Sequence, residues 1–392
     1  MRDMKKDWEI KRLGDVCKVI AGQSPEGEFY NSAGNGMPFY QGKKEFGEKY
    51  IGEPTTWTTK ITKEAETGDI LMSVRAPVGP INFATQKICI GRGLAAIRAG
   101  YSVDKDFLFN FLLKQENEIV GNVGAVFDSI NKTQIENIHI PIPPLLEQKR
   151  IVSILDKCFT AIDKAKVNAE KNLENAKELF ESYLQEVFLK KDREWEIASL
   201  DSLGTITSSK RIYKSEYVKD GIPFYRTKEI KELSNNKPIS LELFISIERY
   251  NEIKKSFGVP KIGDLLLSAV GTIGEIMVIE NDDEFYFKDG NIVWFKDFNN
   301  IDTNYLKYAL TAFVEKIKSL AIGAAYNALT IEKLNKYKIS FPKSIKEQQA
   351  IVRQLDTLRS QTQKLETVYN KKISDLDELK KSILQDAFRG QI

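Results

Sequence analysis

The sequence predicts an α+β protein in which two similar α/β domains are joined by two long antiparallel coiled-coil helices. Three observations lead to this fold class. Nearly all of the 392 residues fall into two similar copies, each copy closes with a long segment that lacks proline and glycine, and the link between the copies is short. The fold therefore contains an internal repeat with a pseudo-two-fold axis.

Five matched segments in the same order carry the repeat, and a repeat of this kind is the first pattern to seek in a sequence. The offset between the copies drifts from 187 through 185, 195 and 199 to 200, which indicates loop insertions in a shared fold. The pairs are WEIKRLGDV (8–16) with WEIASLDSL (195–203), MPFYQGK (37–43) with IPFYRTK (222–228), GDILMS (68–73) with GDLLLS (263–268), GAVFDSINKTQIENIHIPIP (from 124) with GAAYNALTIEKLNKYKISFP (from 323), and ELFESYLQEVF (178–188) with ELKKSILQDAF (378–388).

Each copy divides into a mixed domain and a helix. The mixed part has short apolar runs separated by glycine, proline and asparagine, a pattern typical of strands and turns, with helices such as DFLFNFLLKQENEIV at 106–120. The closing part is rich in Glu, Lys, Leu, Ala and Gln, which favours helix. We expect domains at 1–144 and 193–343 and spacer helices at 145–192 and 344–392.

Apolar residues in both helices recur in steps of three and four, as in coiled coils, and each series contains one extra step of four, a stutter. The predicted seams are Ile151, Leu155, Cys158, Ile162, Ala165, Ala169, Leu173, Ala176, Phe180, Tyr183 and Val187, and Ile351, Leu355, Leu358, Thr362, Leu365, Tyr369, Ile373, Leu376, Leu379 and Ile383. The spacing of Ser344 and Glu347 suggests a capping box, Pro144 suits a first helical turn, and Gly390 suits a helix stop.

The short linker fixes the predicted orientation. Three or four residues between Lys191 and Trp195 cannot return across the length of about 65 Å that 45 helical residues span. The second domain must then follow at the far end of the first helix, so the helices run antiparallel and a domain lies at each end. In the alternative, each helix lies only on its own domain.

Composition and motifs point to a binding protein without catalytic or metal residues. Net charge is +3, and three separated cysteines (Cys17, Cys89, Cys158) read as reduced thiols of a cytoplasmic protein. We find neither a signal peptide nor a run of the ~20 apolar residues that a membrane span needs. The lone histidine, His139, is expected to be a packing or surface residue. GMPFYQGKK (36–44) fails the phosphate-loop spacing, and IGRGLA (90–95) lacks the third glycine of a dinucleotide fingerprint.

The order WEIKRLGDV, PFYQGK, GDILMSV and IPIPPLLEQKRIV, followed by a second such set and a closing LQDAFRGQI, resembles the specificity subunit of type I restriction–modification systems. The resemblance implies two target-recognition domains, each reading half of a split double-stranded DNA target. It implies two methyltransferase subunits and restriction subunits as partners. S-adenosylmethionine and ATP would belong to those partners, so no cofactor is expected here.

Residues shared by the two domains are expected to be scaffold or phosphate contacts, and polar residues that differ at matched positions are candidates for base reading. Gln41 faces Arg226 in the alignment, and glutamine suits adenine whereas arginine suits guanine. The alternative for all candidates is an ordinary solvated surface. The predicted DNA-binding residues are Gln23, Ser24, Tyr30, Tyr40, Gln41, Lys43, Lys44, Arg75 and Arg92 in the first domain, and Ser209, Lys210, Arg211, Tyr213, Tyr225, Arg226 and Lys228 in the second.

Two other functions fit parts of the pattern. A coiled-coil adaptor whose end domains bind proteins or glycans would share the rod and the strand-rich ends. A piece of a fused restriction–methylation enzyme is disfavoured by the start at Met1 and the helix stop near the end. Basic and acidic side chains nearly balance in each domain, at 18 and 18 in residues 1–146 and 22 and 21 in residues 193–345. We therefore expect modest DNA affinity unless the cations cluster on one face.

Overall fold

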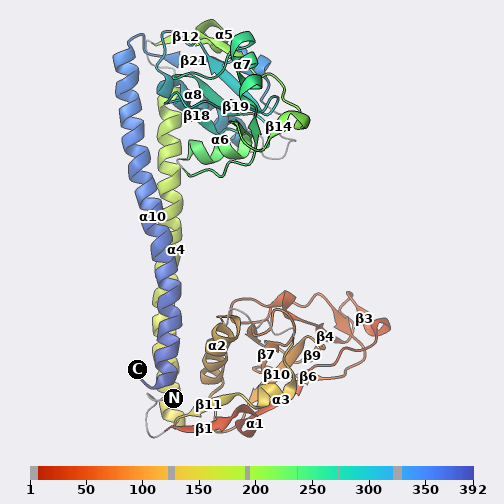
Figure 1. Cartoon of the computed structure of the whole chain (residues 1–392). Coiled ribbons are helices and arrows are strands. Elements are labelled where there is room, and N and C mark those ends of the chain that lie inside the picture. Colours follow the sequence, from red (N-terminus) through yellow and green to blue (C-terminus); the bar gives the residue numbers. More distant parts are fainter. Residues whose placement is uncertain (1–7, 122–128, 190–194, 236, 272, 321–328) are drawn as a thin grey trace. The chain divides into compact units, whose positions relative to one another are not determined.

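The computed structural model describes residues 8–121, 129–189, 195–235, 237–271, 273–320 and 329–392 (Figure 1). The beginnings of one repeat pair, at 124–128 and 323–328, lie outside these residues. The chain divides into two compact units, one made of Met1–Lys171 with Tyr369–Ile392 and the other of Asn172–Val368. Each unit combines one mixed domain with a part of both long helices.

The first domain is built on two larger sheets and a two-stranded ribbon. One sheet is antiparallel with the order β2-β10-β7-β8, and the other has the order β3-β5-β4-β9-β6, with β4 and β9 parallel. The strands are β1 (Glu9–Arg12), β2 (Cys17–Ala21), β3 (Tyr30–Asn31), β4 (Met37–Tyr40), β5 (Trp57–Thr58), β6 (Glu64–Ala65), β7 (Ile70–Ser73), β8 (Ile81–Phe83), β9 (Ile88–Ile90), β10 (Leu94–Ala99) and β11 (His139–Ile142), and the helices are α1 (Leu13–Val16), η1 (Gly27–Phe29), η2 (Lys43–Glu45), α2 (Lys105–Gly121) and α3 (Lys132–Glu136).

The second domain repeats this arrangement, with sheets β13-β20-β17-β18 and β14-β16-β15-β19 and a ribbon β12-β21. Its elements are β12 (Glu196–Ser199), α5 (Leu200–Leu203), β13 (Thr205–Thr207), η3 (Lys214–Glu216), β14 (Tyr217–Val218), β15 (Ile222–Tyr225), α6 (Thr227–Ser234), β16 (Phe244–Ile245), α7 (Ile247–Ser256), β17 (Leu265–Ser268), β18 (Ile276–Val278), β19 (Tyr286–Phe287), β20 (Ile292–Lys296), α8 (Thr303–Leu320), α9 (Ile331–Asn335) and β21 (Lys338–Phe341). The ten-residue helix α7 lies where the repeat offset rises from 185 to 195, so it explains that insertion.

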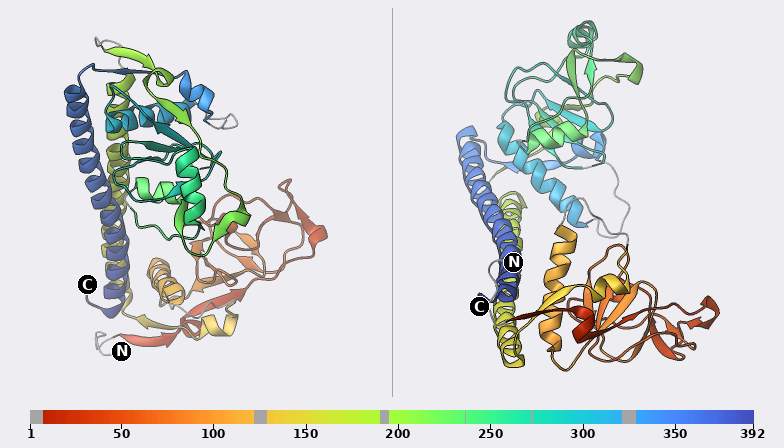
Figure 2. Two further views of the ribbon diagram at one scale, coloured as in Figure 1. Left: turned by 45° about the horizontal axis from the view of Figure 1, so that its top comes forward. Right: turned by 60° about the horizontal axis from the view of Figure 1, so that its bottom comes forward.

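The two long helices, α4 (Leu145–Leu189) and α10 (Ile345–Arg389), are antiparallel, as predicted. In the first unit the start of α4 lies beside the end of α10, where Lys166 pairs with Asp377 at 2.7 Å and Lys380 with Asp163 at 2.9 Å (Figure 1). In the second unit the end of α4 lies beside the start of α10, and the Tyr183 hydroxyl contacts the side chain of Gln354 at 3.4 Å (Figure 2).

Both helices also belong to the cores of the domains. The Phe388 ring of α10 lies 5.0 Å from that of Phe107 on α2. The matching pair in the second unit is Phe188 of α4 and Tyr305 of α8, at 5.2 Å. Each helix therefore packs on its partner helix, and its C-terminal end packs on the domain of the other repeat copy. The alternative in which each helix lies only on its own domain is wrong.

The predicted seam is wrong at two positions of α10. Leu379 is 47 % exposed and Leu365 is 41 % exposed. After the stutter, the step of four from Leu376 reaches Lys380 instead of Leu379. The ammonium of Lys380 lies 5.0 Å from the centre of the Phe159 ring and pairs with Asp163, so a long cationic side chain fills this seam position.

The helix ends follow local signals. Gly390 has a φ of +75°, and the N–H groups of Gly390 and Gln391 donate to the carbonyls of Ala387 and Asp386, which confirms the predicted stop. At the starts, the carbonyls of Pro144 and Ser344 accept the N–H groups three and four residues later. Pro144 thus precedes the first helical residue instead of occupying it.

Candidate nucleic-acid interface

The loops that carry the predicted residues of the first domain meet at one sheet edge. β2, β4, β7 and β9 all end there, and backbone hydrogen bonds join the segments that follow them. Gln23 N–H donates to the Ile90 carbonyl at 2.9 Å, Gly93 N–H to the Gln41 carbonyl at 3.1 Å, and Val74 N–H to the Gly93 carbonyl at 2.9 Å. These bonds hold the four loops in fixed positions relative to each other.

Glycines permit this close approach. A Cβ atom on Gly93 would lie 2.3 Å from the Gln41 carbonyl oxygen, and one on Gly22 would lie 2.2 Å from the Gly91 carbonyl oxygen. Only glycine fits at such distances. The Gly-x-Gly of IGRGLA, which fails as a dinucleotide fingerprint, thus brings the loop of Arg92 against that of Gln41.

Four predicted residues line one concavity of about 330 Å³ at this edge: Gln41, Lys43, Arg75 and Arg92. All four side chains are exposed. Among the described residues, no ion pair engages any of the three cations. The Ser24 hydroxyl accepts the Arg92 N–H at 3.2 Å, and exposed Gln23 precedes it. Within the described segments, the concavity therefore offers three cations outside any ion pair and one amide.

The predicted tyrosines of the strands do not belong to this surface. Tyr40 is 1 % exposed and donates to the Gly52 carbonyl at 2.9 Å, and burial raises its pKa to about 12. Tyr225 is 9 % exposed and stacks on Phe285 at 4.6 Å. The prediction that these two side chains contact DNA is wrong, because both fill the core behind the loops.

Two further predicted residues lie near the edge in different roles. Half-buried Tyr30 stacks on Phe39 at 4.8 Å and donates to the Pro25 carbonyl at 2.8 Å. Lys44 is exposed beside Lys43 in η2 but does not line the concavity.

The predicted loop of the second domain, Ser209 to Tyr213, is partly tied to its own domain. Arg211 pairs with Asp289 at 2.7 Å, and the Lys210 ammonium lies 4.8 Å from the centre of the Phe257 ring. The Ser209 hydroxyl is buried and has no hydrogen-bond partner among the described residues. Tyr213 is 63 % exposed.

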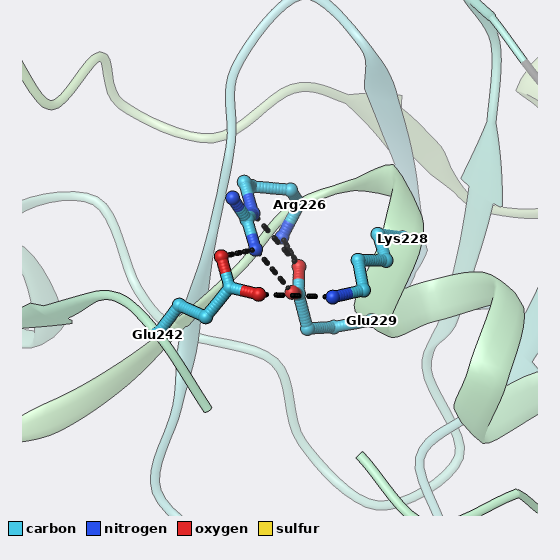
Figure 3. A network of polar contacts seen from close by, with 4 residues as sticks. All are labelled: Arg226, Lys228, Glu229 and Glu242. Carbon is cyan, nitrogen blue, oxygen red and sulfur yellow. Dashed lines mark hydrogen bonds and ion pairs between the residues drawn. The ribbon is translucent and has the colours of Figure 1, made fainter. Parts of the chain in front are cut away.

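Arg226 and Lys228 lie at the start of α6 in a network with two glutamates (Figure 3). Arg226 Nε and Nη2 donate to the Glu229 carboxylate at 3.2 and 2.7 Å. Arg226 Nη2 also donates to Glu242 Oε2 at 2.8 Å, and Lys228 Nζ donates to Glu242 Oε1 at 2.9 Å. Sequence reasoning missed both glutamates.

The charges of these glutamates follow from their partners. Burial acts to raise the pKa of Glu229, but hydrogen bonds from the Arg226 side chain and backbone outweigh it and lower the pKa. Hydrogen bonds from Lys228 and Arg226 lower the pKa of Glu242. Both carboxylates are therefore ionised at neutral pH.

The two domains place different side chains at equivalent positions. Phe39 pairs with Cys89 in the first domain as Phe224 pairs with Tyr286 in the second, so Arg226 stands where Gln41 stands. The position of Arg75 is held by Val270 at the repeat offset of 195. In the part of the chain that the structure describes, the first edge is thus cationic without paired acids, whereas the second is a mixture of cations and acids.

No group of three His, Cys, Asp or Glu side chains in the described segments is arranged to hold a metal ion. His139 is exposed on β11 opposite Arg12 of β1. None of the helices in those segments combines the length and apolar character that a membrane crossing requires.

Comparisons with known proteins agree on one family. The family model described as the type I restriction modification DNA specificity domain matches residues 5–174 and 192–374. A putative type I restriction enzyme specificity subunit of Haemophilus influenzae is 32 % identical over 288 residues, which is 72 % of this chain and 71 % of that protein. Another of Methanocaldococcus jannaschii, the MjaX specificity subunit, is 44 % identical over 180 residues, 45 % of this chain, and the match spans only 42 % of that relative.

Solved structures show the same fold. A chain from a type I restriction–modification system, studied for complex assembly and conformational transition, aligns over 100 % of both chains with a TM-score of 0.81 at 20 % identity. The HsdS subunit from Thermoanaerobacter tengcongensis aligns over 99 % of this chain and 98 % of its own, with a TM-score of 0.64 at 20 % identity. Since the family model covers both copies of the repeat, the chain belongs to the type I restriction–modification specificity subunits, the family that provides DNA sequence recognition.

Proposed function

We propose that this chain reads a bipartite, asymmetric double-stranded DNA target, with one half-site for each domain. The observation that carries the proposal is the concavity at the loop edge of the first domain. Gln41, Lys43, Arg75 and Arg92 come from three separate loops and line one hollow, with no ion pair to the cations among the described residues. An unpaired cationic cluster is what a DNA backbone requires, because phosphate contacts supply most of the affinity.

The side chains that line the concavity suit both phosphate binding, which positions the DNA, and base recognition. Lysine and arginine bind phosphate, and an adjacent amide can bond to the edge of adenine. The glycines of the Arg92 loop keep these side chains close together, since a Cβ atom on Gly93 would strike the backbone of Gln41. The first half-site would thus be read by Gln41 between flanking phosphate contacts.

The differences between the domains support an asymmetric target. Arg226 replaces Gln41, and Val270 replaces Arg75. An arginine favours guanine where a glutamine favours adenine. The same fold would therefore read a different base pattern in the second half-site.

Partner subunits complete the proposed activity. We infer that two methyltransferase subunits and the restriction subunits assemble on this chain and that the chain itself is not catalytic. The helices support two equivalent docking sites, since the junctions at Gln148 and Gln348 and the exposed Leu179 and Leu379 recur at an offset of 200.

Binding to target and random duplexes tests the proposal. Methylome sequencing of the host with and without the gene would define the target, and electrophoretic shift would then compare both duplexes. We expect preference for the target, and weaker binding when Arg75 and Arg92 are both replaced by alanine. Equal binding to random and target duplexes would contradict sequence reading, and the adaptor alternative would then be favoured.

A further inference from the structure

One exposed carboxylate holds two of the cations that the second domain would use for DNA. Glu242 lies just before β16, and its two oxygens bind different residues: Oε2 accepts Arg226 Nη2 at 2.8 Å and Oε1 accepts Lys228 Nζ at 2.9 Å (Figure 3). The Glu242 side chain is 48 % exposed, so water reaches this contact. In bound DNA, a guanine edge at Arg226 and a phosphate at Lys228 would take over these two contacts.

The second carboxylate of the network has a different place. The Glu229 side chain is only 2 % exposed, and it binds Nε and Nη2, the side edge of the Arg226 guanidinium. It also accepts the Arg226 backbone N–H at 2.8 Å. Glu229 therefore fixes the direction of the guanidinium from within the domain.

Glu242 instead engages the end edge of the guanidinium, which is formed by Nη1 and Nη2. Nη1 donates to neither glutamate. An arginine that reads guanine donates two parallel N–H groups to the base. Because Glu229 engages the side edge of the Arg226 guanidinium, the end edge is the one that could provide this pair of donors. Glu242 thus occupies part of the edge that Arg226 would use for DNA.

The matched position in the first domain holds no acid. Phe39 N–H donates to the Thr56 carbonyl as Phe224 N–H donates to the Leu243 carbonyl, which places Thr55 at the position of Glu242. Gln41 and Lys44 stand at the positions of Arg226 and Glu229. The pairing of Arg226 and Lys228 with an exposed glutamate therefore belongs to the second domain and is not repeated at the matched positions of the first.

We propose that Glu242 is an internal competitor for DNA, which holds Arg226 and Lys228 in the free protein and is displaced when the second half-site binds. This inference rests on the proposed function. To bind, the DNA must replace both contacts that Glu242 makes with Arg226 and Lys228. A half-site with poor partners for these two cations replaces the contacts incompletely, so its binding free energy is less favourable. Glu242 would lower the affinity of the second domain and penalise incorrect half-sites.

The test compares Glu242→Gln with the unmodified chain, in complex with its methyltransferase subunits, on a duplex that carries the target. Because exposed ion pairs are individually weak, we expect binding to tighten by about two- to fivefold. Glu242→Thr, which copies the first domain, should act in the same direction. In the Arg226→Ala, Lys228→Ala background the effect of Glu242→Gln should vanish.

Asp282→Asn is the matched control, because it removes one charge from an exposed residue of the same domain that pairs with no cation in the described part of the chain. Equal tightening by this variant would reduce the effect to net charge and overturn the inference. Weaker binding of Glu242→Gln would also overturn it, since Glu242 would then support the bound state. If Glu242→Gln changes nothing while Arg226→Ala weakens target binding, the competitor is disproved and the proposed function stands. If no variant of either domain affects binding, the proposed function itself fails.

Discussion

The Gln148 side chain accepts a hydrogen bond from the backbone N–H of Asp104 at 2.7 Å, and Gln348 accepts the N–H of Asp302 at the same distance. Both glutamines are fully buried. Each also donates to two carbonyls, those of Ser102 and Pro143 in the first case and of Asn300 and Pro342 in the second. The repeated Glu-Gln junction is therefore a lock between each long helix and its domain.

We expect Gln148→Ala and Gln348→Ala to destabilise their units. Either substitution leaves a half-buried backbone N–H and two carbonyls without their partner, at a cost of about 1–3 kcal/mol in the free energy of unfolding. Gln349→Ala is the control, because that neighbouring side chain is exposed and, among the described residues, makes only a contact of 3.4 Å to Asp302. Urea unfolding measures all three, and equal stability of Gln348→Ala and Gln349→Ala would show that the lock is unimportant.

The repeat and the long helices were predictable because they rest on periodicity and on matched segments, which the sequence displays directly. The Leu379 error had a physical origin. A cationic residue, Lys380, occupies the seam, and an apolar pattern overlooks a lysine whose ammonium lies over the Phe159 ring. The capping box predicted from Ser344 and Glu347 stays a prediction.

The candidate site was predictable only in part. Of the four predicted residues that line one hollow, Gln41 and Lys43 came from alignment of the two copies, whereas Arg75 and Arg92 were separate candidates. The acids that engage Arg226 were not found, since Glu242 is 16 residues away and reaches Arg226 only through the fold of the preceding loop. Tyr40 and Tyr225 were misassigned because a residue shared by both copies can equally well serve the core.

Lys43→Ala should weaken binding to every duplex alike. A lysine that contacts phosphate reads no base, and each lost contact lowers the slope of log affinity against log salt by about 0.9. Titration at several salt concentrations on target and random duplexes checks this. A loss restricted to one base variant would identify Lys43 as a base contact.

Gln41→Ala should relax the requirement at one position of the first half-site only. The expected loss is about 1–3 kcal/mol, the worth of one bidentate base contact. Binding to a panel of single-base variants measures it, with Lys44→Ala as the control for a nearby residue that does not line the concavity. An equal loss on all variants would assign Gln41 to the backbone instead.

The ion pair of Arg226 and Glu229 predicts a pH dependence of stability. The pKa of Glu229 lies below its ordinary value of 4.5 in the folded chain. A carboxyl group whose pKa is lower in the folded chain than in the unfolded chain stabilises the fold at any pH above its unfolded-state pKa. This stabilisation is lost as the pH falls through its folded-state pKa. The difference in unfolding free energy between the unmodified chain and Glu229→Gln should therefore be constant above about pH 5 and shrink below pH 4.5. Urea unfolding from pH 7 to pH 3.5 tests it, and a constant difference throughout would contradict it.

The length of the helices should set the gap between the half-sites. Removal of residues 166–172 together with 366–372 takes seven residues from each helix, a shortening of about 10 Å at 1.5 Å per residue. At 3.4 Å for each base pair, the recognised gap should shrink by about three base pairs while both half-sites stay unchanged. Methylome sequencing of a host that carries the deletion variant measures the gap directly.

The paired deletion needs its own control, because it also removes Lys166 and its ion pair with Asp377. Lys166→Ala alone should leave the gap unchanged, since it alters one exposed contact and no length. Deletion from α4 alone should impair folding or assembly, because the two seams then lose their register. An active double deletion that still recognises the original gap would exclude the helices as the spacer, and the gap would then have to be set by the partner subunits.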